Sequence, residues 1–272
     1  MVARGFWAGG RALGGVLLAA AAALPAADLA AQAASADTLR LEVGSPQIDG
    51  RVFPTHSARN RVYMQEGAAP VGTWTNDLSV GDSAGVPVHR WVSRGVQLGP
   101  EGAGASWELV QTYDARTLAP LTYYRWSSNG ASMRLRIDGT RVRGVQQVPG
   151  EATPRTIDRT IDRPGFFAGA TDLVPMAVRM RPGLVITAPF WSPNMEATEV
   201  RVFTVIGEES VHVEGADVTA WKVEERVERT GALTATWYVT DASPYMVLGE
   251  VVLPNGGIQR ITGQALRGVV PD

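Results

Sequence analysis

The alternation of apolar and polar side chains constrains the fold of this chain more than any other feature. The run Met133–Asp138 alternates without a fault, and so does Leu233–Val239. The run Trp221–Glu228 alternates with one fault, at Glu225. Because successive side chains of a strand point to opposite faces, each run predicts a strand with one face on a core and the other in water.

Such strand-like runs recur along the whole chain after its first segment, separated by turn pairs such as Asn129-Gly130, Asp138-Gly139 and Glu214-Gly215. Short strands with regular polar turns are typical of barrels and curved sheets. The sequence therefore predicts an all-β fold: a strongly curved antiparallel sheet that forms a half-open or a closed barrel. The runs lie near residues 39–43, 61–65, 72–80, 86–93, 106–113, 121–127, 132–138, 141–147, 155–162, 184–188, 198–206, 219–228, 233–240, 246–253 and 258–264.

One segment, residues 166–180, departs from the alternation. Leu173, Met176 and Ala177 have helical spacing, and Pro175 limits any helix to a short or kinked one. We expect one short helix around residues 167–178, lying across the sheet.

The sequence contains a weak internal repeat, with one copy at about residues 106–165 and the other at about residues 219–266. In each copy an Asp-Ala turn, at Asp114 and at Asp241, is followed by a strand and then by an Asn-Gly pair. The repeat predicts the same strand–turn–strand–hairpin unit used twice in one sheet, and chance recurrence of common turn residues is the alternative. Because no linker separates the copies, residues 34–272 are predicted to form a single β domain.

The N-terminal segment, residues 1–33, has the pattern of a cleavable signal peptide. Arg4 and Arg11 precede an uncharged apolar run, Leu13–Leu24, and Ala31-Gln32-Ala33 fits a signal-peptidase site. The apolar run is shorter than the roughly 20 residues that span a bilayer. We therefore expect a periplasmic or secreted protein that does not span the membrane after cleavage. The chain has no cysteine and so no lipobox.

Composition excludes several classes of function. The absence of cysteine removes disulfides, thiolate metal sites and a cysteine nucleophile. The net charge is −2, and no cluster of basic residues suggests nucleic-acid binding. The histidines His56, His89 and His212 form no metal-binding pair, so no metal and no cofactor are predicted.

The motif Gly81-Asp82-Ser83-Ala84-Gly85 matches the G-x-S-x-G pattern of serine hydrolases. A nucleophile elbow of that kind stands between a strand and a helix. Here Pro87 and β-branched residues follow, which disfavour a helix, and the same residues suit an ordinary hairpin loop. A hairpin is the preferred interpretation.

Four short patterns in the C-terminal half resemble a known family. They are Pro182-Gly183, Val205–Gly215, Thr219–Glu224 and Thr236–Asp241. Their order resembles a family of bacterial periplasmic all-β domains of unknown function, which is similar to the half-open barrel of periplasmic lipoprotein carriers. The resemblance covers residues 165–264 best, and it implies no catalytic residues.

Large apolar side chains around the segment that breaks the alternation are the candidate ligand-binding residues. They line a cavity if the barrel is half-open, and they fill the core if it is closed. The leading hypothesis is a non-catalytic exported envelope protein that binds an apolar or lipid-like ligand or partner in this concavity. The alternatives are a structural or interaction module of the envelope with a filled core, and a serine hydrolase that uses Ser83. The candidate residues are Phe166, Phe167, Met176, Phe190, Trp191, Trp221 and Trp237.

Overall fold

The computed structural model describes residues 37–65, 67–97, 104–171 and 173–266. The predicted signal peptide and its cleavage site lie outside these residues. The described chain is built almost entirely of strands, as the alternation predicts. The strands are β1 (Thr38–Arg40), β2 (His56–Tyr63), β3 (Gly72–Ser83), β4 (Val86–Gln97), β5 (Ala105–Asp114), β6 (Pro120–Ser127), β7 (Ser132–Asp138), β8 (Arg141–Gln147), β9 (Arg155–Thr160), β10 (Phe166–Phe167), β11 (Val185–Trp191), β12 (Glu199–Val213), β13 (Ala216–Val227), β14 (Leu233–Val239), β15 (Met246–Val252) and β16 (Ile258–Ala265).

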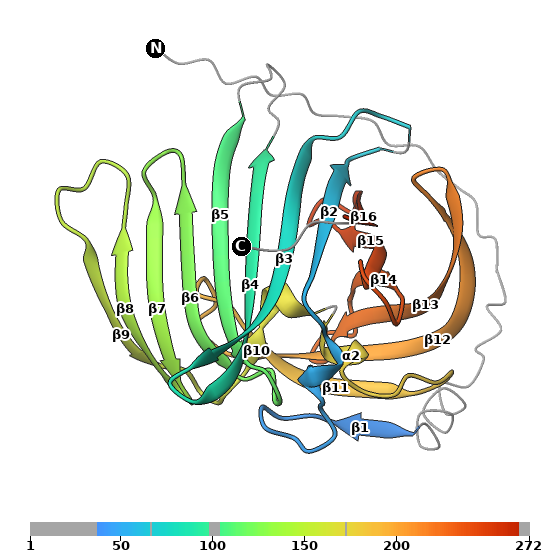
Figure 1. Cartoon of the computed structure of the whole chain (residues 1–272), viewed down its shortest axis with the longest axis horizontal. Coiled ribbons are helices and arrows are strands. Elements are labelled where there is room, and N and C mark those ends of the chain that lie inside the picture. Colours follow the sequence, from blue (N-terminus) through green and yellow to red (C-terminus); the bar gives the residue numbers. More distant parts are fainter. Residues whose placement is uncertain (1–36, 66, 98–103, 172, 267–272) are drawn as a thin grey trace, which may run out of the picture. The chain divides into compact units, whose positions relative to one another are not determined.

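One sheet holds these strands, and it consists of two antiparallel meanders joined side by side. The first meander runs from β2 to β9 and the second from β11 to β16, and β16 pairs with β2 between them. Along the sheet path the ends are β1 and β9, which do not pair with each other. The sheet is therefore not closed, and of the two predicted forms the half-open one is observed (Figure 1).

The chain has to pass from one end of the sheet to the other between the two meanders. β9 lies at one end of the strand order, and β11 lies next to β1 at the opposite end. The crossing segment contains β10, the 3₁₀ turn η2 (Ala168–Ala170) and the helix α2 (Leu173–Met176). It lies within the curve of the sheet (Figure 1). The prediction of one short helix around residues 167–178 is confirmed.

The main core forms where the crossing segment meets the sheet. Phe166, Phe167 and Val174 from this segment are almost completely buried. They belong to one apolar cluster with side chains from both meanders, such as Tyr113 of β5 and Phe203 of β12. Burial of large side chains is the main favourable term in folding, so the crossing segment holds the two meanders together.

The two copies of the predicted repeat share local geometry. A register shift follows Thr112 where β5 pairs with β6, and another follows Tyr238 where β14 pairs with β15. The backbone is left-handed four residues after the aspartate of each Asp-Ala turn. These positions are Leu118, with φ 55°, and Tyr245, with φ 61°. Each copy is thus a strand, a bulged turn, a strand and a hairpin, and the described residues from 37 onward belong to one compact unit.

Candidate functional site

The structure corrects the position of four candidate residues. Phe166, Phe167, Phe190 and Trp191 are each at most 1% exposed and belong to the main core. Their rings pack on one another, for example Phe166 on Phe190 with centroids 5.8 Å apart. These side chains fill the interior where the crossing segment passes. They therefore offer a ligand no surface, and the prediction that they line a cavity is wrong for these four.

The other three candidates are only partly buried. Met176 of α2 and Trp221 of β13 pack against the main core and line none of the hollows described below. Trp237 of β14 lines one of these hollows, and its role in ligand binding stays a prediction.

This hollow is a pocket of about 250 Å³ on the concave side of the sheet, which we call the concave pocket. One wall comes from β3, β4 and β5, and the opposite wall from β14, β15 and β16. Ala168, Gly169 and Thr171 of the crossing segment complete it. The remaining lining residues are Trp74, Asn76, Trp91, Ser93, Trp107, Leu109, Gln111, Trp237, Met246 and Ile261.

Two tryptophans of the concave pocket lie across glycines of the neighbouring strand. Trp107 pairs in register with Gly95, and Trp237 with Gly249. A β-carbon added at either glycine would stand 2.7 Å from an indole atom of its partner. Trp74 lies on the other side of Gly95, and its ring centroid is 6.3 Å from that of Trp107. The glycines thus leave room for the indoles that shape the pocket.

The polar side chains on the β3–β4 wall form hydrogen bonds with one another. The Trp91 indole N–H donates to Ser93 Oγ at 2.9 Å, and the Ser93 hydroxyl donates to Asn76 Oδ1 at 2.6 Å. Buried polar groups are expected to be paired in this way.

Gln111 of β5 is the exception. Its side chain is almost fully buried, with 3% of the residue exposed, and it lines the concave pocket. Within the described residues no hydrogen bond joins its side-chain amide to another protein group. The amide lies near Gly169, where an added β-carbon would stand 3.5 Å from Gln111 Oε1. An amide offers two donor hydrogens and an acceptor oxygen, so this residue presents unused hydrogen-bonding capacity to the pocket.

A buried carboxylate fixes the orientation of Trp237. The Trp237 indole N–H donates to Glu225 Oε2 at 2.7 Å, and the Arg201 guanidinium donates to Glu225 Oε1 at 2.9 Å. Burial raises the pKa of the Glu225 carboxyl, and the hydrogen bond from Trp237 and the charge of Arg201 oppose that rise. Glu225 is the single fault in the alternation of its strand. That fault was the sequence signal for a polar group on the inner face.

A second hollow, of about 420 Å³, adjoins the concave pocket and shares Trp74 and Trp107 with it. Val62, Val71 and Gln259 are among its lining residues, near the ends of β2, β3 and β16. The concave pocket is thus continued toward this end of the strands.

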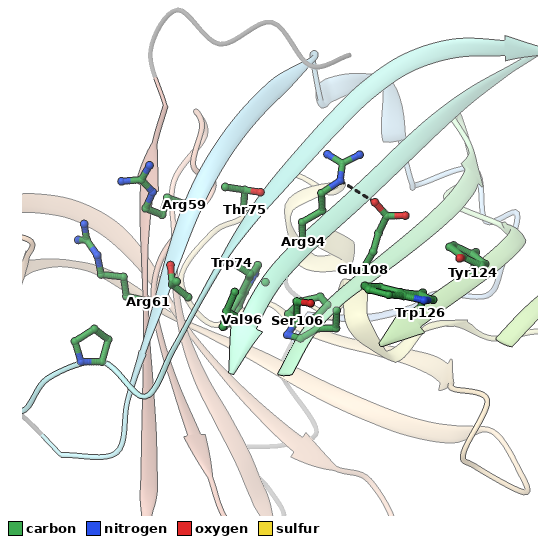
Figure 2. Close-up of a pocket in the computed structure, with 14 residues that line it drawn as sticks. Arg59, Arg61, Trp74, Thr75, Arg94, Val96, Ser106, Glu108, Tyr124 and Trp126 are labelled. Carbon is green, nitrogen blue, oxygen red and sulfur yellow. Dashed lines mark hydrogen bonds and ion pairs between the residues drawn. The ribbon is translucent and has the colours of Figure 1, made fainter. Parts of the chain in front are cut away.

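A third hollow, about 820 Å³ and larger than the two above, lies on the outer face of β2 to β6, and we call it the outer groove (Figure 2). Two rows of paired residues cross these strands in register. Their side chains share one face, opposite to that of Trp74 and Trp107, because neighbouring side chains of a strand alternate. One row is Arg61, Thr73, Val96 and Ser106, and the other is Arg59, Thr75, Arg94, Glu108 and Trp126.

The Gly81–Gly85 motif lies in a hairpin, which the sequence favoured over a nucleophile elbow. Ser83 ends β3 and Val86 begins β4, with left-handed backbone at Ala84 and Gly85 between them. Asp82 Oδ1 accepts a hydrogen bond from the Gly85 N–H at 2.8 Å. The serine therefore stands in a strand–turn–strand context, which differs from the strand-to-helix elbow of hydrolases.

None of the three histidines lines the concave pocket, although the His56 ring packs edge-on against the lining residue Trp91 with centroids 6.1 Å apart. His89 Nε2 is 2.7 Å from Gly50 O, and His56 Nδ1 is 3.0 Å from Pro54 O. His212 is exposed and contacts Asp217. In the described part of the chain, His, Asp and Glu side chains nowhere gather in threes as metal ligands would. A helix with the length and apolarity to cross a bilayer is likewise not found there.

Sequence reasoning missed Gln111, Glu225 and the role of Trp74. Glycines inside the strands at Gly95 and Gly249 were an available signal, because a glycine in a strand often marks close approach of another group. Gln111 left no signal of its own, since a single glutamine in an alternating run is ordinary.

Comparison with known proteins gives a family. A β-barrel-like protein from Brucella abortus, a domain of unknown function named DUF1849, has a solved structure similar to this one, with 9% identity and a TM-score of 0.47. The similarity covers 78% of this chain and 96% of that chain. A search of curated proteins found no match. The model of the family described as "Protein of unknown function (DUF3108)" matches residues 61–261, most of the chain. The resemblance to a family of all-β domains of unknown function is confirmed, and the chain belongs to the DUF3108 family.

Proposed function

We propose that this protein is an exported, non-catalytic envelope protein that binds a ligand with an apolar body and one hydrogen-bonding group in its concave pocket. The observation that carries the proposal is Gln111, an almost fully buried residue whose side-chain amide has no hydrogen-bond partner among the described residues, in a pocket walled by indoles. A ligand that pairs with this amide gains a hydrogen bond, which is worth about 0.5–1.5 kcal/mol net.

The pocket walls support an apolar ligand body. Trp74, Trp107 and Trp237 present large ring surfaces, and Leu109 and Ile261 add aliphatic ones. Small-molecule pockets combine such surfaces with a few placed polar groups, and typically have volumes of about 300–1,000 Å³. The concave pocket and its adjoining hollow together offer this combination.

Export to the envelope is part of the proposal and rests on residues 1–33. A positive start, a short apolar run and a small-residue cleavage pattern support it. A lipid-like ligand, such as a fatty acid or an acylglycerol, is a natural apolar molecule of that compartment.

The test is thermal unfolding of residues 34–272 with and without long-chain fatty acid, monoacylglycerol and phospholipid. A ligand at about a hundredfold excess over its dissociation constant stabilises the native state by about 2.7 kcal/mol. We expect Gln111→Leu to lose this shift while the unliganded protein stays as stable as wild type. Gln47→Leu, at an exposed loop position, is the matched control and is expected to keep the shift.

A second candidate is an envelope interaction module with a filled core. It is favoured by the complete burial of Phe166, Phe190 and Trp191, which fill much of the interior. If no lipid of the panel shifts the unfolding temperature of wild type, the ligand-binding proposal is rejected in favour of this module.

A further inference from the structure

The outer groove contains one arginine, Arg59, whose charge has no carboxylate partner among the described residues. Among the described residues that line it are three arginines, Arg59, Arg61 and Arg94, and a single carboxylate, Glu108. All of these side chains lie on the face opposite to the concave pocket, as the register of β2 to β5 requires.

Two of the arginines are held in place by carboxylates. Arg61 pairs with Glu214, which also accepts a hydrogen bond from the Thr262 hydroxyl at 2.7 Å. The Arg94 Nε–H donates to Glu108 Oε2 at 2.7 Å, and Arg94 Nη1 lies 3.4 Å from Asp77 Oδ2. Their positions are thereby fixed.

Arg59 differs from both. It is exposed at the middle of β2, two residues from Arg61 on the same face. No hydrogen bond or ion pair joins its guanidinium to another described residue. The guanidinium presents a planar set of donors that matches a phosphate or carboxylate oxygen pair. Thr75 lies beside Arg59 in register, and Thr73 lies beside Arg61, so hydroxyl groups accompany both cations.

The rest of the groove is apolar and aromatic. Trp126 is 39% exposed and Val96 37%, although both are large apolar side chains. Tyr124 lies on the same strand as Trp126, two residues away, and both line the groove (Figure 2). Because Trp126 pairs with Glu108, and Glu108 with Arg94, the aromatic end and the cationic end belong to one continuous row.

We propose that the outer groove is a binding site for an amphiphilic anion, whose phosphate or carboxylate binds Arg59 near Arg61 and whose apolar part extends along the groove over Val96 and Trp126. The arginines of this site lie on the face opposite to the concave pocket, with which the groove shares the lining residues Trp74 and Trp107. The proposal does not depend on the function proposed for that pocket. The anion chemistry is shared by soluble alkyl phosphates and by acidic phospholipids of a membrane.

The test is calorimetric titration of residues 34–272 with hexyl phosphate, with inorganic phosphate and hexanol as partial ligands. We expect saturable binding of hexyl phosphate, and affinity at least about tenfold lower for each partial ligand, since each lacks one of the two contacts. Equal affinity for inorganic phosphate, or no binding of hexyl phosphate and of phosphatidic acid vesicles, overturns the proposal.

Single-residue variants test whether hexyl phosphate binds at Arg59 in the outer groove. Arg59→Gln is expected to weaken hexyl phosphate binding at least about tenfold, as loss of a charge-assisted contact requires. Arg90→Gln is the matched control, because Arg90 is also an exposed strand arginine of the outer face but does not line the groove. Equal effects of the two variants would show a nonspecific charge effect and contradict the proposal. Gln111→Leu is expected to leave this binding unchanged, so the outcome is independent of the concave pocket.

Vesicles distinguish the two sources of the anion. Sedimentation with phosphatidic acid vesicles, lost in Arg59→Gln, would identify a membrane lipid as the ligand. Binding of hexyl phosphate without vesicle association would identify a free amphiphile. Equal sedimentation with vesicles of phosphatidylcholine, which is zwitterionic and has no net charge, would contradict a role for the arginines.

Discussion

The side-chain amide of Gln111 lies beside Gly169, so close that a β-carbon at Gly169 would stand 3.5 Å from Gln111 Oε1 and 3.7 Å from Nε2. These are ordinary van der Waals distances, so Gly169→Ala is expected to fold with a free energy of unfolding within about 0.5 kcal/mol of wild type. The added methyl group would cover the amide. Ligand-induced stabilisation should therefore decrease, as measured by thermal shift with the lipid panel. An unchanged shift would mean that the ligand does not reach Gln111.

Gly95→Ala, in contrast to Gly169→Ala, is expected to lower the free energy of unfolding. A β-carbon there would stand 2.7 Å from Trp107 and 2.7 Å from Trp74, so the indoles or the strands must move. Overpacking of this kind costs about 1–3 kcal/mol. Urea unfolding measures the loss, and a changed tryptophan fluorescence spectrum of the folded variant would report the displaced indoles. A stability equal to that of wild type would show that the rings are free to shift at no cost.

Trp191→Ala is expected to destabilise the protein by about 3–5 kcal/mol, as truncation of a large core side chain does. Trp191 is 1% exposed, and the Arg159 guanidinium lies 5.2 Å from its ring centroid. Met133→Ala should cost less, because Met133 is only partly buried at the edge of the core. Chemical denaturation measures which of the two variants loses more free energy of unfolding. A smaller loss for Trp191→Ala would restore its assignment to a cavity wall.

The stability of the protein is expected to fall as the pH falls below about 6.5, partly through His56. Burial lowers the pKa of His56 from 6.5, with the hydrogen bond to Pro54 and the charge of Asp77 acting against this. The unfolded state therefore binds the proton first. The contribution of neutral His56 is complete above pH 6.5 and is lost as the pH falls through the lower folded pKa.

His56→Gln isolates this contribution. The difference in free energy of unfolding between wild type and variant should shrink between about pH 7.5 and 5.5, by at most about 1.4 kcal/mol per pH unit. The carboxyl of Glu225, whose raised pKa acts with the opposite sign, is present in both proteins and cancels in the difference. A difference that stays constant with pH would show that His56 has the same pKa in both states.

Processing of the N-terminus tests the export proposal. If residues 1–33 form a signal peptide, the exported protein should begin near Ala34, because cleavage follows the small residues Ala31 and Ala33. N-terminal sequencing of protein from the envelope fraction measures this. Intact Met1 in a membrane fraction would reject cleavage.

The sequence by itself determined the strands, their hairpins and the short helix. Runs such as Met133–Asp138 alternate because a curved sheet has one face on a core and one in water, and this pattern is local to each strand. The turn pairs are local as well, so the order of the strands along each meander followed from the chain.

Only the tertiary structure decided what fills the interior. Phe166 and Trp191 have the same apolar character whether they line a cavity or fill a core, and the difference depends on the crossing between β9 and β11. That crossing follows from the pairing of β16 with β2, which joins residues about two hundred positions apart and which no local pattern encodes. The same long-range pairing brings Trp237 and Gln111 into the lining of one pocket. Arg59 and Arg94 of the outer groove share a row through the pairing of β2, β3 and β4, which are consecutive in the chain.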